Sequence, residues 1–395
     1  MFYLGIDVGK FSHSFCLLNS SNGKKQIWQF HNTKHGFTEL KKKIDKNISI
    51  SDYSKLIIGM EATGHYFLNI YEFFLNCEIN SDNIALLNPL QVKSFRNTNL
   101  RGAKSDNIDA ERIATLLHFG GYKRCNVATD KIMNLRELTR LRTDLVANTS
   151  SLKRKIIAIM DRIFPEFTNV FSNKFGKTAV ALLTEYSTPE EMAELSICEL
   201  TEIIKKVSKR GISEKKIEHL HNSAQNSIGI TFGQEAFKFE LKILLERLEM
   251  LQKQTDKLEN KIEDIISEYN SPLFTIPGIG KVTGAAIIAE IGDINSFSSA
   301  TKLIAFAGLD PKLRESGTYQ GRTPISKRGS KYLRNVIWYS AMVASRVNPK
   351  LREDYLKRRE QGKSHRYAVT ATANKLTKII YHILKNNCSF NPELV

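Results

Sequence analysis

The sequence predicts an α/β domain over residues 1–125, a helical coiled-coil region over 126–270 and a mainly α-helical C-terminal domain over 271–395. Three patterns support this division. Short apolar runs alternate with helical patterns in the first region, and long leucine and isoleucine stripes at helical spacing fill the second. A glycine-punctuated basic stretch and alanine-rich helices make up the third. A chain of 395 residues has the length of two or three ordinary domains.

The first region begins with three successive strands and continues with strands that alternate with helices. Short apolar runs bounded by polar residues indicate the strands, and apolar residues at wider spacing indicate the helices. This order predicts a mixed sheet in an α/β domain. The expected strands are 2–8, 14–19, 26–32, 56–61 and 84–88, and the expected helices are 36–44 and 66–76.

Two long apolar stripes predict two long helices in the middle region. The first runs from Leu135 to Ile163 and ends before Pro165, which cannot continue a helix. The second keeps a heptad-like spacing, which favours a coiled coil over simple packing on a globular core. Residues 166–235 between the stripes are expected to be polar, partly helical connections. The second stripe consists of Leu241, Leu244, Leu248, Leu251, Leu258, Ile262 and Ile265.

The C-terminal region opens with a helix–hairpin–helix pattern, IPGIGKVTGAAIIAEIG. Gly278 and Gly280 would form the tight turn, and Lys281 follows at the start of a helix. Backbone N–H groups at such a turn suit a phosphate and read no base sequence. A plain turn between two packed helices is the alternative.

Positive charge is concentrated towards the C-terminus. The chain has a net charge of +17, and residues 301–395 hold 19 Lys and Arg against 6 Asp and Glu. Residues 1–130 hold 16 against 12. This asymmetry predicts a polyanionic partner that contacts one part of the chain. The densest segment contains one acid, Glu315, and the basic residues Lys312, Arg314, Arg322, Lys327, Arg328, Lys331 and Arg334.

Other features of the chain exclude several protein classes. No apolar run is long enough to cross a bilayer, so no membrane association is expected. The N-terminal residues lack the pattern of a secretory signal peptide. The five cysteines are scattered without a CxxC pair, which argues against a zinc ribbon or a disulfide framework. A cytoplasmic location is therefore expected.

Four acids have positions that favour a metal site. Asp7 lies inside an apolar strand, where an acid is costly without a partner, and Glu61 ends another strand. Asp106 and Asp109 are three residues apart at a helix start, on one helical face. Clustered carboxylates suit Mg²⁺ and phosphodiester chemistry. Taken singly, Asp106 could be an N-cap, Asp109 a first-turn helix acid and Glu61 a surface residue.

Ser316 precedes Gly317 in the most loop-like part of the basic segment. Composition alone favours an ordinary turn serine at this position. A serine hydroxyl becomes an effective nucleophile only when nearby groups activate it or stabilise the displaced charge, and arginines and metal ions do so.

The four acids, together with GIDVGK, GMEATGHY, NPLQVKSFR and KSDNIDAERIA, resemble the RuvC-like, RNase H-type domain of the DEDD insertion-sequence transposases. That family includes the Piv invertase and the bridge-RNA-guided recombinases. The segment GLDPKLRESG and the later ISKRGSKYLR resemble the family's C-terminal transposase domain. The resemblance therefore covers both ends of the chain.

The resemblance implies a mechanism with a metal ion and a serine. Asp7, Glu61, Asp106 and Asp109 would hold Mg²⁺, and Ser316 would form a transient covalent link to DNA. Ser326 and Ser330 are the alternative nucleophiles. The implied partners are element-end and target DNA, a noncoding guide RNA and further copies of the chain in a homodimer or homotetramer.

Three rival hypotheses remain open on the sequence. A RuvC-like junction nuclease would keep the acids and use water in place of Ser316. A sugar kinase of the actin-like ATPase fold would explain LGIDVGK, but the chain lacks a second Asp-x-Gly-Thr phosphate loop. A non-catalytic nucleic-acid-binding protein would need only the basic surface.

Overall fold

A computed structural model gives the structure of the chain in two compact units, Met1–Val127 and Ala128–Val395. It describes residues 1–62, 64–77, 79–87, 89–96, 105–122, 124–125, 129–208, 212–312, 315–316, 319–320 and 324–392, with the backbone alone at 90, 96, 124–125, 315–316 and 319–320. Within these ranges, no helix has the length and apolar character needed to span a bilayer.

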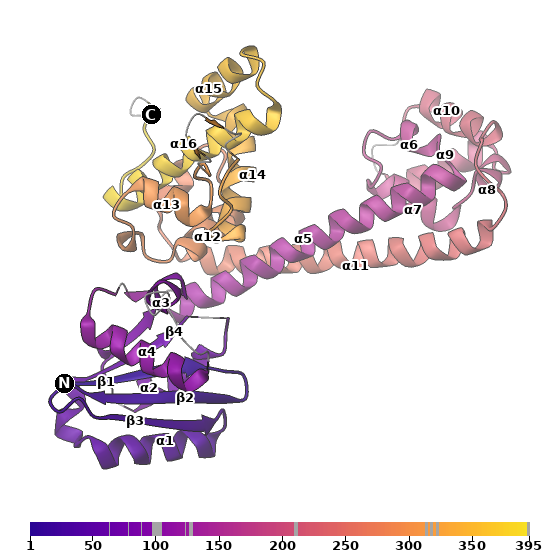
Figure 1. Cartoon of the computed structure of the whole chain (residues 1–395). Coiled ribbons are helices and arrows are strands. Elements are labelled where there is room, and N and C mark those ends of the chain that lie inside the picture. The colour runs from indigo at the N-terminus through magenta and orange to yellow at the C-terminus, as the bar shows by residue number, and fades with distance from the viewer. Residues whose placement is uncertain are drawn as a thin grey trace. The chain divides into compact units, whose positions relative to one another are not determined.

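The first unit is built on a mixed sheet of six strands in the order β3-β2-β1-β4-β5-β6 (Figure 1). The first three strands pair antiparallel, whereas β1, β4 and β5 run parallel to one another and β6 pairs antiparallel with β5. The bounds are β1 Phe2–Val8, β2 Ser12–Asn19, β3 Lys25–His31, β4 Leu56–Glu61, β5 Ile84–Leu87 and β6 Arg124–Cys125. The arrangement is consistent with the predicted RNase H-like α/β domain.

Helices cover both faces of this sheet. One face packs Leu4 and Ile6 of β1 against α1 (Lys34–Asn47) and α2 (Phe67–Asn76). The opposite face packs against α3 (Pro89–Arg96) and α4 (Asp106–Phe119). Successive residues of a strand point to opposite faces, so alternate residues of β1 face α4.

The sequence predicts the five longer strands and the helices α1, α2 and α4. It does not predict α3, which follows β5 with hardly any connection, or the two-residue β6. A two-residue strand carries no periodicity, so only its pairing with β5 reveals it. Two short 3-10 turns, η1 (Ile50–Lys55) and η2 (Ser81–Asn83), lead into β4 and β5.

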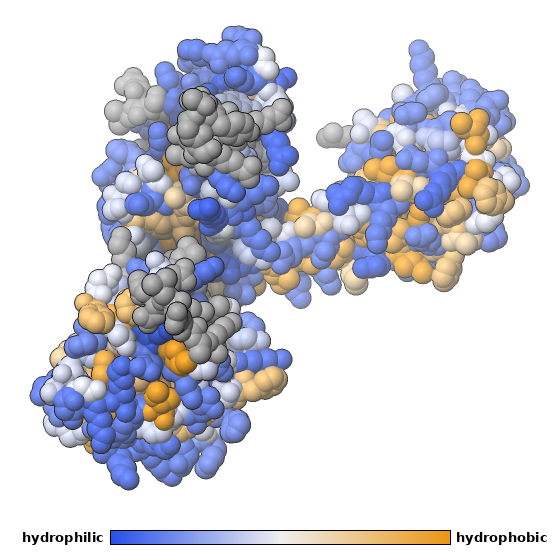
Figure 2. Space-filling model, in the orientation of Figure 1, coloured by the Kyte–Doolittle hydropathy of each residue, from blue (hydrophilic) through white to orange (hydrophobic). Residues whose placement is uncertain are grey.

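The second unit contains the two long helices that the leucine stripes predict. They are α5 (Asp130–Ile163) and α11 (Gln234–Ser267), each of 34 residues, and they pack side by side within the chain (Figure 1). Figure 2 shows apolar residues at the surface along the pair. The exposed apolar residues of these two helices include Leu141, Val146 and Met250.

The segment 166–235 is partly helical, as expected, but it does more than connect the two long helices. This segment forms five helices that pack with the end of α5 and the start of α11 around a core of their own. The buried residues of the segment, such as Phe167, Leu200 and Leu220, are separated by charged residues, so composition hides the core. The helices are α6 Phe167–Val170, α7 Lys177–Glu185, α8 Pro189–Ala193, α9 Ile197–Val207 and α10 Glu214–Gln225.

The other ends of α5 and α11 share a second core with the C-terminal helices, through Leu135 and Ile262 among others. The predicted boundary at 271 therefore lies inside one compact unit, and the three-domain division stays a prediction. The remaining elements are η3 Pro272–Thr275, α12 Lys281–Ile291, η4 Ile294–Ser296, α13 Ala300–Ala307, β7 Glu315–Ser316, β8 Tyr319–Gln320, α14 Lys331–Val347, α15 Pro349–Glu360 and α16 His365–Asn386.

Candidate functional site

Asp7 and Glu61 lie at the carboxyl ends of neighbouring parallel strands. The register pairs Gly5 with Gly59 and Ile6 with Met60, so the next residue of each strand is one of these acids. Because Ile6 and Met60 are buried on the face that α1 and α2 cover, the acids that follow point to the face that α4 covers. The fold therefore places both carboxylates on one face at one edge of the sheet.

Helix α4 is held close to β1 by the absence of a side chain at Gly5. A Cβ atom there would lie 2.2 Å from the carbonyl oxygen of Ala110 and 2.3 Å from the amide nitrogen of Ala114. Such distances are impossible, so only glycine permits this approach. Ala110 directly follows Asp109 and lies one turn after Asp106, so the contact fixes the first turn of α4 near the strand end that carries Asp7.

A polar network ties the same turn of α4 to the neighbouring strands. The amide of Gln29 donates to Ser14 Oγ at 3.1 Å and to Asn107 Oδ1 at 3.2 Å. Ser14 is the cross-strand partner of Asp7. The helix start that follows Asp106 is therefore bonded to the residue beside Asp7.

Asp106 and Asp109 differ in their surroundings. Ser105 caps α4 by accepting a hydrogen bond from the Ile108 amide at 3.4 Å, which leaves Asp106 as the exposed first residue of the helix. Asp109 is only 5% exposed, and its carboxylate accepts a hydrogen bond from Arg112 at 3.0 Å. The N-cap role considered for Asp106 therefore belongs to Ser105.

These acids match a hard divalent ion in donor type and backbone placement. All four are carboxylates, the ligands that Mg²⁺ prefers. Within the described residues, however, no three His, Cys, Asp or Glu side chains converge on one point, and Asp109 pairs with Arg112. Metal binding at this edge would require the carboxylates to turn towards one another.

Ser316 lies on a short β-hairpin. Its backbone pairs with Tyr319, so only two residues connect β7 and β8. The base of the hairpin is closed by hydrogen bonds from the Lys312 amide to the Pro324 carbonyl and from the Ser326 amide to the Asp310 carbonyl. The strand residue Ser316 therefore lies between these two closing hydrogen bonds along the chain.

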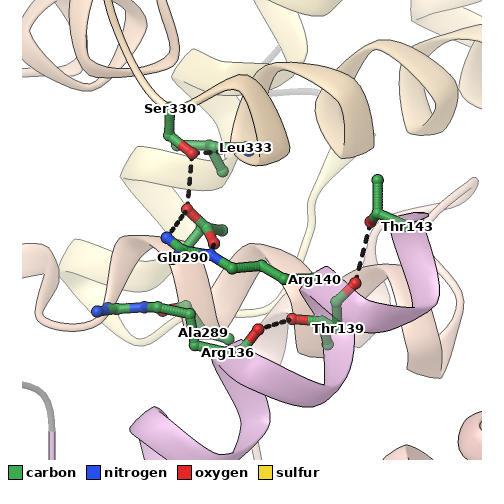
Figure 3. Close-up of polar contacts among 8 residues, drawn as sticks. All are labelled: Arg136, Thr139, Arg140, Thr143, Ala289, Glu290, Ser330 and Leu333. Carbon is green, nitrogen blue, oxygen red and sulfur yellow. Dashed lines mark hydrogen bonds and ion pairs between the residues drawn. The ribbon is translucent and has the colours of Figure 1, made fainter. Parts of the chain in front are cut away.

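The hydroxyls of Ser326 and Ser330 are already engaged. Ser326 Oγ donates to the Asp310 carboxylate at 2.5 Å. Ser330 is the N-cap of α14: its Oγ accepts from the Leu333 amide at 3.1 Å and donates to Glu290 Oε2 at 2.6 Å (Figure 3). Both hydroxyls thus have structural partners, which Figure 3 displays for Ser330.

Glu290 is a buried acid that the sequence analysis overlooks. It is 4% exposed, and Arg140 of α5 donates to both of its oxygens, at 2.6 and 3.2 Å (Figure 3). Arg136 adds a bond to the Ala289 carbonyl at 2.8 Å. An acid inside the apolar run AAIIAEIG was the available signal. The network joins α5, α12 and the start of α14.

The two glycines of the predicted helix–hairpin–helix turn have different roles. Gly278 has a φ of 101°, and a Cβ there would lie 2.7 Å from Ala344 Cα, so this glycine serves packing against α14. Gly280 is exposed and caps α12, with its amide bonded to Thr283 Oγ1 at 3.0 Å. Lys281 is the exposed first residue of α12. Gly280 and Lys281 are therefore exposed at the start of α12, whereas Gly278 packs against α14.

The basic residues near α14 also differ. Lys327, Arg328 and Lys331 are exposed, whereas Lys312 is half-buried. Arg334 donates to the Ala307 carbonyl at 3.0 Å, so it also caps the end of α13. Two further predicted contact residues, Arg314 and Arg322, lie outside the described residues.

Comparison with known proteins gives matches at both ends of the chain. Residues 4–165 match a family of DEDD transposases, and residues 270–356 match the transposase IS116/IS110/IS902 family. The two matches together cover more than half of the chain.

Individual relatives support the same assignment. The chain is 25% identical to the 42 kDa protein of insertion element IS900 from Mycobacterium paratuberculosis, over 99% of this chain and 97% of that protein. It is 26% identical to a putative transposase for IS117 from Streptomyces coelicolor, over 79% and 78%. It is 35% identical to the pilin gene-inverting protein of Moraxella bovis, over 31% and 39%. The chain therefore belongs to the DEDD transposases of the IS116/IS110/IS902 family, enzymes that act on DNA.

Proposed function

We propose that the protein is a cytoplasmic, Mg²⁺-dependent recombinase that cuts and rejoins DNA at the ends of an insertion sequence and at its target. The observation that supports this most directly is the convergence of backbone positions at one sheet edge. Two acids end adjacent parallel strands on the face under α4, and the first turn of α4 carries the other two. Carboxylates at such an edge suit a phosphate-processing metal site.

Asp7, Glu61, Asp106 and Asp109 would hold the metal. When bound, Mg²⁺ would offset the charge that develops on the scissile phosphate and on the leaving oxygen. Asp109 would either turn away from Arg112 or bind the metal through the carboxylate oxygen that does not pair with Arg112. In the second case, the Arg112 guanidinium would orient the metal-binding carboxylate by hydrogen bonding to its other oxygen. The Gln29–Ser14–Asn107 network would keep the helix start in register with Asp7.

Ser316 would supply the nucleophile. Its Oγ would attack phosphorus and form a serine–phosphate ester, while the bond to one deoxyribose oxygen breaks and that oxygen takes up a proton. Reversal with a different DNA end would rejoin the strand and free the serine. Arginines of the surrounding basic segment would stabilise the charge that develops.

The basic surface would bind the nucleic acid backbone. Five of the proposed contact residues, Gly280, Lys281, Lys327, Arg328 and Lys331, are exposed near the starts of α12 and α14, and phosphate contacts of this kind carry no sequence information. We propose that an element-encoded guide RNA supplies sequence choice by pairing with the DNA, as base pairing does in other RNA-guided systems. The proposed contacts are Gly280, Lys281, Lys312, Arg314, Arg322, Lys327, Arg328, Lys331 and Arg334, with Gly278 shaping the turn.

The active form would contain at least two copies of the chain. The acids and Ser316 belong to different compact units, and we propose that each site combines the acids of one copy with the serine of another. We propose that α5 and α11 form a coiled coil whose exposed apolar residues, such as Leu141 and Met250, contribute to assembly as a homodimer or homotetramer.

The direct test is cleavage of a labelled DNA that carries the element's end junction, with the cognate RNA and Mg²⁺. Wild type should yield a protein–DNA adduct on a denaturing gel, and Asp7→Ala and Ser316→Ala should not. Glu72→Gln, an exposed acid of α2 in the same unit, is the matched control and should behave as wild type. Chelation of Mg²⁺ should abolish adduct formation, and adding Mg²⁺ back should restore adduct formation.

Each alternative gives a different pattern in this assay. DNA cut without an adduct, by wild type and Ser316→Ala alike, would identify a hydrolytic junction nuclease and remove Ser316 from the mechanism. Activity that survives replacement of all four acids would refute the metal site.

A further inference from the structure

A groove of about 610 Å³ lies within the second unit, between the segment that precedes α14, the exposed face of α14, the start of α16 and one turn of α5. Its lining contains four Lys or Arg residues, Lys327, Lys331, Arg334 and Arg366, and one acid, Asp144. The groove therefore favours an anionic occupant. Its volume is that of a small-molecule pocket rather than of a surface that receives a duplex.

The periodicity of α14 explains why this face is both basic and aromatic. Leu333, Ile337 and Ala341 are fully buried against the C-terminal core. Lys331 and Trp338 are seven residues apart on the other side of the helix and line the groove, together with Tyr339. Trp338 also packs against the C-terminal core, whereas Tyr339 is 52% exposed beside the cations.

The rings of the groove are not equivalent. Arg140 and Lys331 already lie over the ring of Tyr332, at 4.9 and 4.7 Å from its centre. Tyr339 is 52% exposed, and its ring meets that of Trp338 edge-on at 5.4 Å. The ring of Tyr332 is therefore already in contact with two cations, whereas the ring of Tyr339 is accessible to a ligand.

Trp338 is held in place by the helix opposite. Its indole N–H donates to Thr370 Oγ1 of α16 at 3.3 Å, and Thr370 donates in turn to the Arg366 carbonyl at 2.7 Å. A ring fixed in this way costs little conformational entropy when a ligand stacks on it. The fixed indole supports the exposed ring of Tyr339 beside it.

The geometry points to this groove as a binding site for an unpaired nucleotide segment, with bases stacked on Tyr339 and Trp338 and phosphates at Lys327, Lys331 and Arg366. A base offers its flat face only when it is not stacked in a duplex, and aromatic rings beside cations are the features that bind single strands. The inference rests on the proposed function in taking nucleic acid as the ligand. It adds that this site selects unpaired over paired strands.

The test uses the full chain with Trp28→Phe, which leaves Trp338 as its only tryptophan. Short single-stranded oligonucleotides should quench Trp338 fluorescence, and abasic strands of equal length and charge should not. DNA and RNA strands are compared in separate arms, because the stacking chemistry is common to both. A duplex of the same length should bind without quenching.

Tyr339→Ala should weaken single-strand binding by about 5- to 150-fold, the equivalent of about 1–3 kcal/mol for one lost stack. Its affinity for the duplex should change less than about twofold, within the scatter of a surface substitution. Tyr339→Trp should restore binding. Phe239→Ala is the matched control, since Phe239 of α11 is 69% exposed and lies outside the groove.

Equal losses in Tyr339→Ala and Phe239→Ala, or equal quenching by abasic strands, would overturn the groove assignment. Ser316→Ala should retain full quenching. Adduct formation without quenching would refute the groove as a binding site and support the recombinase. Quenching without any adduct would support the groove as a binding site and refute the recombinase.

Discussion

Two serines of the basic segment have hydroxyls that bond to carboxylates. Ser330 caps α14 and bonds to the buried Glu290, and Ser326 bonds to Asp310. Ser316 lies next to the two-residue connection of its hairpin. A hydrogen bond to a carboxylate is also how a base activates a serine, so the resemblance to the family, rather than these bonds, selects Ser316 as the nucleophile.

Ser330→Ala should lower the free energy of unfolding by about 1–2 kcal/mol, because it removes a helix cap and a hydrogen bond to a charged group. Adduct formation by the folded variant should be unchanged. Urea denaturation and the adduct assay measure the two effects. Ser316→Ala should show the converse, with full stability and no adduct; loss of the adduct in Ser330→Ala below its unfolding transition would make Ser330 the nucleophile.

His13 is a buried histidine of the sheet: it is 1% exposed and stacks on Phe37 with 5.9 Å between the ring centres. Burial lowers its pKa below 6.5, an effect that the Asn32 side chain partly opposes. The unfolded chain therefore binds a proton as the pH falls below about 6.5, while the folded chain resists it. Stability should fall from pH 7 to pH 5.

His13→Leu should remove this part of the pH dependence. Urea denaturation at a series of pH values would measure it, and a variant as sensitive as wild type would show that other groups cause the loss. His31 of β3 is exposed, so His31→Leu is the control and should retain the wild-type profile.

At the scale of elements, the docking of α4 on β1 decides where its acids lie. Gly5→Ala would drive a Cβ into the helix backbone at 2.2 Å from Ala110 O, and backbone cannot yield as a side chain does. We expect a loss of stability of about 3 kcal/mol or more, in the upper range of overpacking, and loss of the adduct. Differential scanning calorimetry and the adduct assay would measure both.

Gly59→Ala is the comparison for that variant. Its Cβ would meet Leu117 Cδ1 at 2.7 Å, and the far end of a leucine side chain can shift. The expected loss is about 1 kcal/mol, at the lower limit for overpacking. Equal effects of the two substitutions would argue that the approach of α4 to Gly5 has no special role.

A half-buried ion pair links α5 to the C-terminal helices, in addition to the apolar core that they share. Arg140 and Glu290 join α5 to α12, and Ser330 links the same carboxylate to α14. Removing the arginine would leave a buried carboxylate with only a serine partner. The ends of α5 and α11 that pack on the C-terminal helices are therefore held by the hydrogen bonds of Glu290 as well as by the apolar core.

For the whole molecule, the separation of the acids and Ser316 into two units makes the composition of the active assembly testable. If each site takes acids from one copy and serine from another, mixing Asp7→Ala with Ser316→Ala should restore adduct formation. About a quarter of the wild-type sites should be active in a randomly mixed symmetric dimer. A mixture as inactive as its components would show that each site is built within one copy.

Much of the fold could be predicted from local patterns. Strands β1 to β5 and helices α1, α2, α4, α5 and α11 follow from apolar spacing, because each buries a stripe of its own residues. The helices between 166 and 235 could not, because their buried residues are few per helix and converge only after folding. The four acids lie where local patterns place them, at strand ends and a helix start, whereas the partners of Glu290 come from distant segments that no local pattern brings together.

The sequence by itself determined the family, the four carboxylates, the basic segment and the two long helices, since these rest on residue identity and local periodicity. Only the tertiary structure decided which residues meet. It set Asp7 and Glu61 on the face that α4 covers, gave Ser330 and Arg334 structural partners, and lined a groove with Trp338 and Tyr339. The physical reason is that contacts between distant segments depend on strand register and helix packing, and no local pattern encodes these.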